Sequence, residues 1–344
     1  MSALRRAFPA LLLFLLLLPL WAGAVTAGNA LRALPDAALL RYHTHSFSHT
    51  QLLQIEKSEG ENERALPFSA FTQLDAQPVE SKLYRRTVQA DVLLFYGDLR
   101  RILRAVPEME FVSSADETGC AVDRDTAFRL WGSAQVLGET LLFEGREYTV
   151  RAVFDAPEGT VALPVPTEGH GLSVLAVDTP EGRDARQQAE EFYRRHGLPA
   201  PDALTTGGWY GPVSRCLILL PALPLLAALL WGILRELWGM RRTPVLCALW
   251  CLAAAVLFWG LFHFSGFRLS LPPGLVPTRW SDFEFWRRLL EGWGENLQNA
   301  LLTPVLAPDR LVGSALLRLL SCSFFAAADV IGMMILYYKY KKGR

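Results

Sequence analysis

The sequence is poor in the features that mark most enzymes and nucleic-acid-binding proteins. Its 34 basic and 34 acidic residues give a formal net charge of zero, and without a strong basic field nucleic acid is not an expected partner. Five cysteines are present, but only Cys120 falls outside the hydrophobic segments. A disulfide framework or a paired-cysteine metal site in the polar part of the chain is therefore excluded.

Catalytic signatures are also lacking. The chain has no G-x-x-x-x-G-K-[ST] for nucleotide phosphates, no G-x-S-x-G nucleophile turn and no H-E-x-x-H zinc motif. The acidic residues of its polar part are scattered, as on a solvated surface. The sequence predicts neither a catalytic residue nor a cofactor, and we do not expect this chain to be an enzyme.

Long apolar runs are abundant instead, in a chain that is 51% hydrophobic. Four of them are long enough to cross a bilayer core of roughly 30 Å. We expect membrane helices at residues 1–28, 214–236, 244–266 and 311–338. The first run has a second interpretation, because its basic start, leucine-rich centre and small residues near its end also describe a cleavable signal peptide.

Basic residues cluster at the amino terminus, around the short loop 237–243 and in the tail 339–344. The positive-inside rule places these three segments in the cytoplasm, so residues 29–213 and 267–310 lie on the other side of the bilayer. Export without a disulfide framework is compatible with a bacterial plasma membrane. The sequence therefore predicts a multi-pass protein of the plasma membrane with its main domain outside.

The exported segment 29–213 has the size of one domain, and its patterns are of mixed α+β type. Alternating or β-branched runs predict strands, and apolar residues at helical spacing predict helices. The expected strands are 88–95, 109–113, 159–165 and 172–177, and the expected helices are 98–104, 123–131 and 184–196.

The stretch from Gly132 to Phe154 is central to this domain. Two apolar runs, Thr140 to Phe143 and 148–154, flank a break at Glu144-Gly145-Arg146. Gly145 permits a positive φ, and the β-branched and aromatic residues on both sides suit a pleated surface. The stretch therefore predicts a tight hairpin, preceded by a short helix that ends at Gly132.

This helix, turn and hairpin resemble the extracytoplasmic core domain of MacB/FtsX-type ABC transporter permeases. The layout of one membrane helix, a large external domain and three further helices is also that of such a permease half, and hydropathy and charge give it independently. The positions that match the family pattern are Ala127, Leu130, Gly132, Val136, Leu137, Gly138, Gly145, Tyr148, Thr149, Val150 and Val153.

The resemblance implies a permease-like subunit that couples a separate cytoplasmic ABC-type ATPase to the external domain, for export or for transmitting force to the envelope. It also implies a second permease chain, identical or related. In the family the loop after the second span contacts the ATPase, and a basic loop that only fixes topology is the other interpretation of this short loop. The corresponding positions are Arg235, Glu236, Leu237, Trp238, Gly239, Arg241 and Arg242.

Two ionisable residues fall inside the last apolar run. Arg318 and Asp329 are costly in a bilayer, and such residues usually face protein. Their spacing of eleven residues puts them on nearly the same helix face but about 16 Å apart, so they do not pair directly. We expect Arg318 to reach the outer interface and Asp329 to contact a neighbouring helix, with snorkelling or an ion role as alternatives for Asp329.

The segment 267–310 contains an amphipathic pattern. Phe283, Trp286, Leu290 and Trp293 recur at intervals of three and four residues, with charged residues between them. A stripe of this kind, with two tryptophans, predicts a helix that lies at the outer membrane interface in contact with lipid.

Three histidines, His43, His45 and His49, lie close together near the start of the exported segment. On a strand they would share one face, so a zinc or copper site is conceivable, although surface or packing histidines are the more ordinary interpretation. A membrane metalloenzyme built on them, and a membrane-anchored binding or sensor protein that needs no ATPase, are the alternatives to the permease.

Overall fold

The computed structural model describes residues 2–32, 34, 37–103, 113–155, 159–167, 169–179, 185–207, 210–228, 231, 259, 284–287, 291 and 305–342. They belong to two compact units. The first, which we call the domain unit, contains Arg32–Tyr210 and Pro272–Ser314, and the second, the helical unit, contains Met1–Leu31, Gly211–Leu271 and Ala315–Arg344. Each unit is described by itself.

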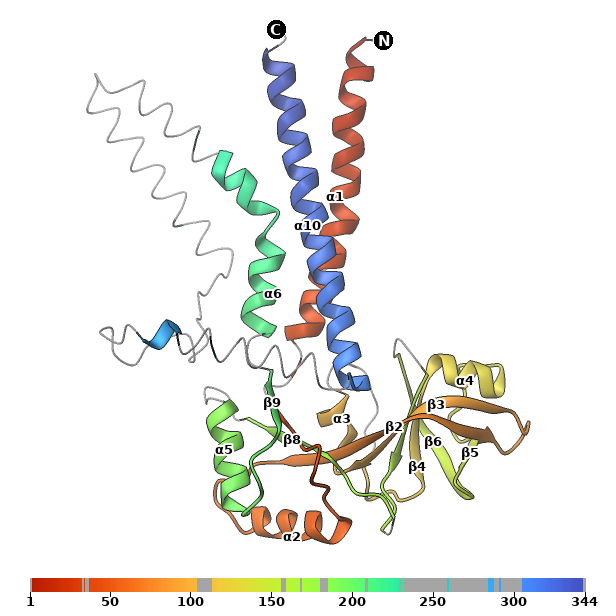
Figure 1. The fold of residues 1–344 in the computed structure, drawn as a ribbon. Coiled ribbons are helices and arrows are strands. Elements are labelled where there is room, and N and C mark those ends of the chain that lie inside the picture. The colour runs from red at the N-terminus through yellow and green to blue at the C-terminus, as the bar shows by residue number, and fades with distance from the viewer. Residues whose placement is uncertain are drawn as a thin grey trace. The chain divides into compact units, whose positions relative to one another are not determined.

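The domain unit is an α+β structure, as its sequence patterns predict (Figure 1). Its strands are β1 (Ala37–Arg41), β2 (Phe68–Ser81), β3 (Thr87–Tyr96), β4 (Gly119–Asp123), β5 (Thr140–Phe143), β6 (Arg146–Phe154), β7 (Thr160–Pro164), β8 (Val174–Asp178) and β9 (Ala203–Thr206). Its helices are α2 (His49–Gly60), α3 (Leu99–Ile102), α4 (Arg124–Trp131) and α5 (Ala185–Arg195).

The long strand β2 joins two parts of one sheet. Along the described chain the strand order is β3-β7-β4-β6-β5-β2-β8-β1-β9, and β2 also pairs with β3. The pairings from β3 around to β2 therefore close into a ring, in which β2 pairs with β5 only through Glu80 and Ser81. On the edge of β2 that faces away from β3, its first residues, Phe68–Phe71, pair with β8 and not with β5. The same strand therefore also carries the branch β8-β1-β9.

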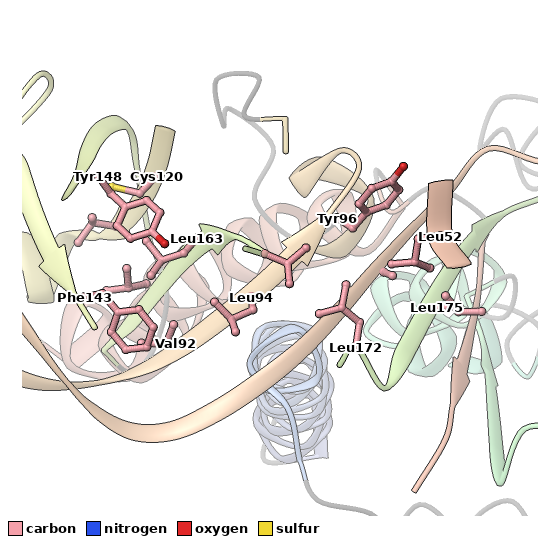
Figure 2. Packing of buried hydrophobic residues seen from close by; sticks show 14 of the residues in the cluster. Leu52, Val92, Leu94, Tyr96, Cys120, Phe143, Tyr148, Leu163, Leu172 and Leu175 are labelled. Atoms are coloured by element: carbon pink, nitrogen blue, oxygen red, sulfur yellow. The ribbon is translucent and has the colours of Figure 1, made fainter. Parts of the chain in front are cut away.

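The central strands are apolar on both faces. In β3, Val92, Leu94 and Tyr96 point into one buried cluster, whereas Leu93 and Phe95 point into another. This alternation follows from the two-residue period of a strand. Helices α2, α4 and α5 contribute to the first cluster, part of which Figure 2 shows along β3 between Tyr148 and Leu52. Helix α3 contributes to the second cluster.

The predicted helix and hairpin form as expected from their local signals. The buried side chain of Asp123 accepts hydrogen bonds from the N–H groups of Asp125 (2.8 Å) and Thr126 (3.0 Å), which caps the start of α4. Gly132 ends α4 in the left-handed conformation, with φ 77°. Between β5 and β6, Glu144 and Gly145 both have positive φ, 48° and 76°, as in a type I′ hairpin turn.

A buried carboxylate joins α2 to α5. Glu59 accepts hydrogen bonds from the Leu66 N–H (2.6 Å) and from Arg195 (2.8 Å), and its other partner is the ring of His196 (2.8 Å). Burial by itself raises the pKa of Glu59, but these hydrogen bonds outweigh it and hold the pKa below its usual value of 4.5. The charged form of Glu59 therefore fastens the two helices to each other.

The helical unit contains most of two long helices, α1 (Ser2–Arg32) and α10 (Ala307–Lys342), and α6 (Tyr210–Leu219). In the described part of the chain two helical segments are long and apolar enough to cross a membrane, Leu12–Arg32 and Ala307–Leu336. By length and composition, the described residues thus contain two candidate membrane spans. Of the two other expected spans, 214–236 is described only at 214–228 and 231, and 244–266 lies almost wholly outside the described residues.

Small residues allow α1 and its neighbours to approach closely. Ala24 and Ala27 are buried, and a Cβ added at Gly23 would lie 3.0 Å from Sγ of Cys322. At Gly28 an added Cβ would collide with Ile218 of α6 and would also contact Leu319 of α10. Packing of this type, with glycine and alanine at the contact, is common between membrane helices.

The hairpin turn generates the first prediction. Gly145→Ala should lower the free energy of unfolding by about 1–2 kcal/mol, because alanine at φ 76° is strained even though the space around it is open. Gly60→Ala is the matched control: its surroundings are also open, it lies in α2, and alanine there should be neutral or stabilising by up to about 1 kcal/mol. Denaturant unfolding of the full chain in mild detergent measures both, and equal effects would contradict the turn assignment.

The helix contact generates the second prediction. Gly28→Ala should lower the thermal stability of the detergent-solubilised chain, because its methyl group collides with Ile218. Gly313→Ala adds the same methyl group to α10 where nothing lies within 4 Å, so it should leave the melting temperature unchanged or raise it. A chain cleaved after Ala24 or Ala27 would not respond to the Gly28 change, so the same comparison distinguishes a retained α1 from a signal peptide.

Candidate functional site

The start of α10 lies in the core of the domain unit. This helix has 36 residues and is about 54 Å long, well above the thickness of a bilayer core. Its first residues, up to Ser314, belong to the domain unit. Ala307 and Leu311 are buried, and Leu311 lies in the same apolar cluster as Leu93 and Phe95. The helix therefore begins as part of the domain.

An ion pair fixes the start of α10 to β1. Nη2 of Arg41 lies 2.5 Å from Oδ1 of Asp309, and the two side chains are only 8% and 26% exposed. The other oxygen of Asp309 accepts a hydrogen bond from the Leu306 N–H at 3.0 Å, which satisfies a backbone donor at the helix start. Asp309 thus caps the helix and attaches it to the sheet at once.

A second ion pair fixes α10 to β3, and here the helix supplies the basic residue and the strand the acidic one. Nη2 of Arg310 lies 2.5 Å from Oδ2 of Asp91, with side chains 23% and 17% exposed. In addition, the Ala307 N–H donates to Oε1 of Gln73 in β2, at 2.7 Å. The adjacent residues Asp309 and Arg310 therefore reach strands β1 and β3 with opposite charges, and we call these residues and their partners the docking site.

A small cavity lies beside the docking site. Its volume is about 30 Å³, roughly the room of one water molecule, and it is lined by residues of β1, β9, α3 and the start of α10, including Leu39, Thr205 and Asp309. A ligand pocket usually has several hundred Å³. The arrangement is suited to holding the helix and not to holding a small-molecule substrate.

The expected ATPase-contacting residues lie outside the described part of the chain. This applies to all of Arg235, Glu236, Leu237, Trp238, Gly239, Arg241 and Arg242, whose role stays a prediction.

The two ionisable residues of α10 are described and are not brought together. Arg318 is exposed, and no ion pair joins it to Asp329 among the described residues. Asp329 is partly buried, and its Oδ2 has no hydrogen-bond partner within the described part of the chain. The expected contact of Asp329 with a neighbouring helix stays a prediction.

The expected interfacial helix is described only in part. Residues 285–287 are helical, and the exposed Trp286 packs edge-to-face on Phe285 with ring centroids 5.4 Å apart. Arg287 pairs with Glu284 and Glu291 at helical spacing. Phe283, Leu290 and Trp293 lie outside the described residues, so the contact with lipid stays a prediction.

The three histidines do not lie together on a strand. His43 and His45 follow β1 in a loop, and His49 is the first residue of α2. The ring of His45 packs against Phe47 at 4.8 Å, and that of His49 against Tyr96 at 5.4 Å. No cluster of metal-binding side chains occurs among the residues that the structure describes. These contacts favour the packing interpretation over the metal site.

Sequence reasoning missed the docking site. Its partners are far apart in the chain: Asp309 is 268 positions after Arg41, and Arg310 is 219 positions after Asp91. Asp309 and Arg310 were expected in the loop 267–310, just before a span starting at residue 311. The one available signal was a pair of opposite charges at the start of a long apolar run, a pattern that helix capping alone also explains.

Comparison with solved structures finds similar extracytoplasmic domains, among them the following two. The periplasmic region of MacB from Actinobacillus actinomycetemcomitans is 9% identical, with a TM-score of 0.40 over 52% of this chain and 91% of that one. The extracellular domain of the noncanonic ABC-type transporter YknZ from Gram-positive bacteria is 11% identical, with a TM-score of 0.36 over 50% of this chain and 98% of that one. These are the kind of protein that the hairpin sequence resembles.

No protein-family model and no curated protein sequence matches the chain.

The docking site generates the third prediction. Arg41→Met should destabilise the domain unit by about 2 kcal/mol, below the roughly 3–5 kcal/mol of a fully buried broken pair because Asp309 is partly exposed. Arg100→Met is the control, since Arg100 is 53% exposed in its pair with Asp98 and should cost about 0–1 kcal/mol. Circular dichroism of the full chain during denaturation measures both. A loss at Arg41 no larger than at Arg100 would contradict the docking role.

Proposed function

We propose that this chain is a permease-like membrane subunit of an ABC transporter. It couples a separate cytoplasmic ATPase to its extracytoplasmic domain, for export or for transmitting force to the envelope. Its chemistry is binding and movement, and the ATP hydrolysis belongs to the other chain.

One observation carries this proposal: an apolar helix of membrane length begins inside the core of the domain. Leu311 is buried in the domain unit, and the apolar part of the same helix runs on to Leu336. A displacement of such a helix along its axis reaches the sheet through Asp309 and Arg310 without a flexible linker between them. A domain that merely needed an anchor would be served equally well by a loose tether.

The membrane arrangement in this proposal has four spans, with both termini in the cytoplasm. The two candidate spans α1 and α10 support the first and the last of them. The charge distribution supports the orientation, because basic residues gather at the two ends and around the loop 237–243. In this arrangement the loop faces the ATPase, and a second permease chain completes the assembly within the lipid bilayer.

An alternative function is a membrane-anchored binding or sensor protein that works without an ATPase. The short loop 237–243 favours it, because little surface is left for contact with a large cytoplasmic partner. The same docked helix would then carry a signal inward from the domain.

The fourth prediction tests the permease against the sensor. The full chain, purified from its own membrane in mild detergent, should retain an ATP-hydrolysing protein at near-stoichiometric yield. Glu236→Gln with Arg241→Gln should remove that protein and the hydrolysis, because both residues belong to the expected contact.

The matched control changes the same two residue types on the opposite side of the membrane. Glu284→Gln with Arg287→Gln removes an exposed pair in the segment expected outside, and it should leave the ATPase bound. Absence of any ATPase from the unmodified chain would favour the sensor, and equal loss in both double variants would indicate a general failure of assembly.

A further inference from the structure

We propose that Asp91 is a positioning residue that links the start of α10 to a bend in the β2–β3 hairpin, so that the position of α10 sets the shape of this hairpin. The inference rests on the proposed function only for the direction of the movement, from α10 to the β2–β3 hairpin. It deepens that function by naming the path from the helix into the domain.

The β2–β3 hairpin contains a bulge. The register of the two strands is regular from Ala70 to Leu74 and again from Gln77 to Glu80, and it shifts between Leu74 and Gln77. Within the bulge, Ala76 has a φ of 49°, a conformation that residues other than glycine rarely adopt. A bulge bends the strand that contains it and increases its twist. The hairpin therefore has a defined place where it can change its bend.

Asp91 uses its two oxygens for two different elements. Its Oδ1 accepts a hydrogen bond from the Ala76 N–H at 3.0 Å, and its Oδ2 pairs with Arg310. The carboxylate thus holds the strained residue of the bulge with one oxygen and the start of α10 with the other. Because both oxygens belong to one planar group, a shift of Arg310 that keeps both contacts changes the geometry at Ala76.

A second contact reaches the other side of the bulge. Gln73 lies just before it in β2, and its Oε1 accepts the hydrogen bond from the Ala307 N–H at 2.7 Å. The first turn of α10 therefore contacts the hairpin on β2, before the bulge, and on β3, opposite the bulge. Two points of attachment, one before the bend and one at the bend, allow a rotation of the helix to change it.

The part of the hairpin beyond the bulge is the element that would move. Its end closes the ring of strands, because Glu80 and Ser81 of β2 pair with Leu142 and Leu141 of β5. The loop that follows carries two exposed apolar side chains, Leu83 at 63% and Tyr84 at 53%. A change of bend at Ala76 therefore moves a strand of the ring and an exposed apolar tip together.

The fifth prediction separates this role from plain stabilisation. Arg310→Gln, studied in the full chain in mild detergent, should speed amide hydrogen exchange about tenfold in peptides that cover residues 73–80, because the charged anchor of Asp91 is lost. Exchange in β8, which does not contact the bulge, should stay unchanged. Exchange that rises equally in β8 and at the bulge would overturn the proposal.

A matched control is available one element away. Arg101 pairs with Asp178 at 2.6 Å, both side chains being 29% exposed, so its burial resembles that of the Arg310 pair. Arg101→Gln should not accelerate exchange at residues 73–80. If it does so as strongly as Arg310→Gln, the bulge responds to any lost ion pair and the proposed link is wrong.

A charge swap gives a sharper test. The double variant Asp91→Arg with Arg310→Asp restores the ion pair between α10 and β3, but an arginine cannot accept the hydrogen bond from the Ala76 N–H. The swap should recover most of the thermal stability lost in Asp91→Arg alone, whereas exchange at residues 73–80 stays fast. Recovery of both would show that docking alone holds the bulge, and the positioning role would be refuted.

The hydrogen-exchange test and the ATPase test have independent outcomes. Hydrogen exchange needs no ATPase, so a local response at the bulge would support the link through Asp91 even if no ATPase co-purifies. The link would then belong to a sensor protein. Conversely, a bound ATPase with uniform exchange in Arg310→Gln refutes the link through Asp91 and leaves the permease standing.

Discussion

Apolar side chains on both faces of the central strands organise the domain. A strand that is buried on both sides needs a cover for each face. Helices α2, α4 and α5 contribute to the cover of one face, but on the other α3 has only four residues. The start of α10 contributes to this face through Leu311 and the partly buried Leu306. The apolar start of this helix therefore belongs in the domain, where it covers part of the second face of the sheet.

The polar contacts around this apolar surface decide how the helix lies on it. Apolar contact is not directional, and a helix held by Leu311 alone would be free to rotate or slide. Asp309 and Arg310 remove that freedom because they reach different strands with opposite charges. All four paired side chains keep some contact with water, so their electrostatic contribution is screened. Their larger effect is on the orientation of the helix.

Local signals account for the part of the fold that the sequence predicts well. The α4 helix was predicted because apolar residues at helical spacing precede Gly132, a favourable helix end, and the hairpin because Gly145 stands between two apolar runs. Strand β2 was missed because Pro78 and the polar residues before it interrupt the alternation. Proline is tolerated there because β5 pairs only with the last two residues of β2, beyond Pro78.

One local signal was misjudged. His49 was considered as part of a strand, although Ser48 and Gln51 form a capping box that starts α2.

Long-range contacts account for most of what the sequence could not predict. The domain was expected to end near residue 213, whereas residues 305–314 also belong to it. Neither ion pair of the docking site has a local signature, because each depends on which strands become neighbours after folding.

The docking site also bears on the choice between the permease and the sensor. Coupling between two sites is reciprocal, so a contact that lets the helix change the hairpin lets a load on the hairpin change the helix by the same free energy. The docked helix by itself is therefore compatible with transmission from the helix to the hairpin and from the hairpin to the helix. What distinguishes the two functions is the source of energy at the cytoplasmic side. A permease draws it from a bound ATPase, whereas a sensor has only the binding energy of its ligand, which limits the shift between its two states.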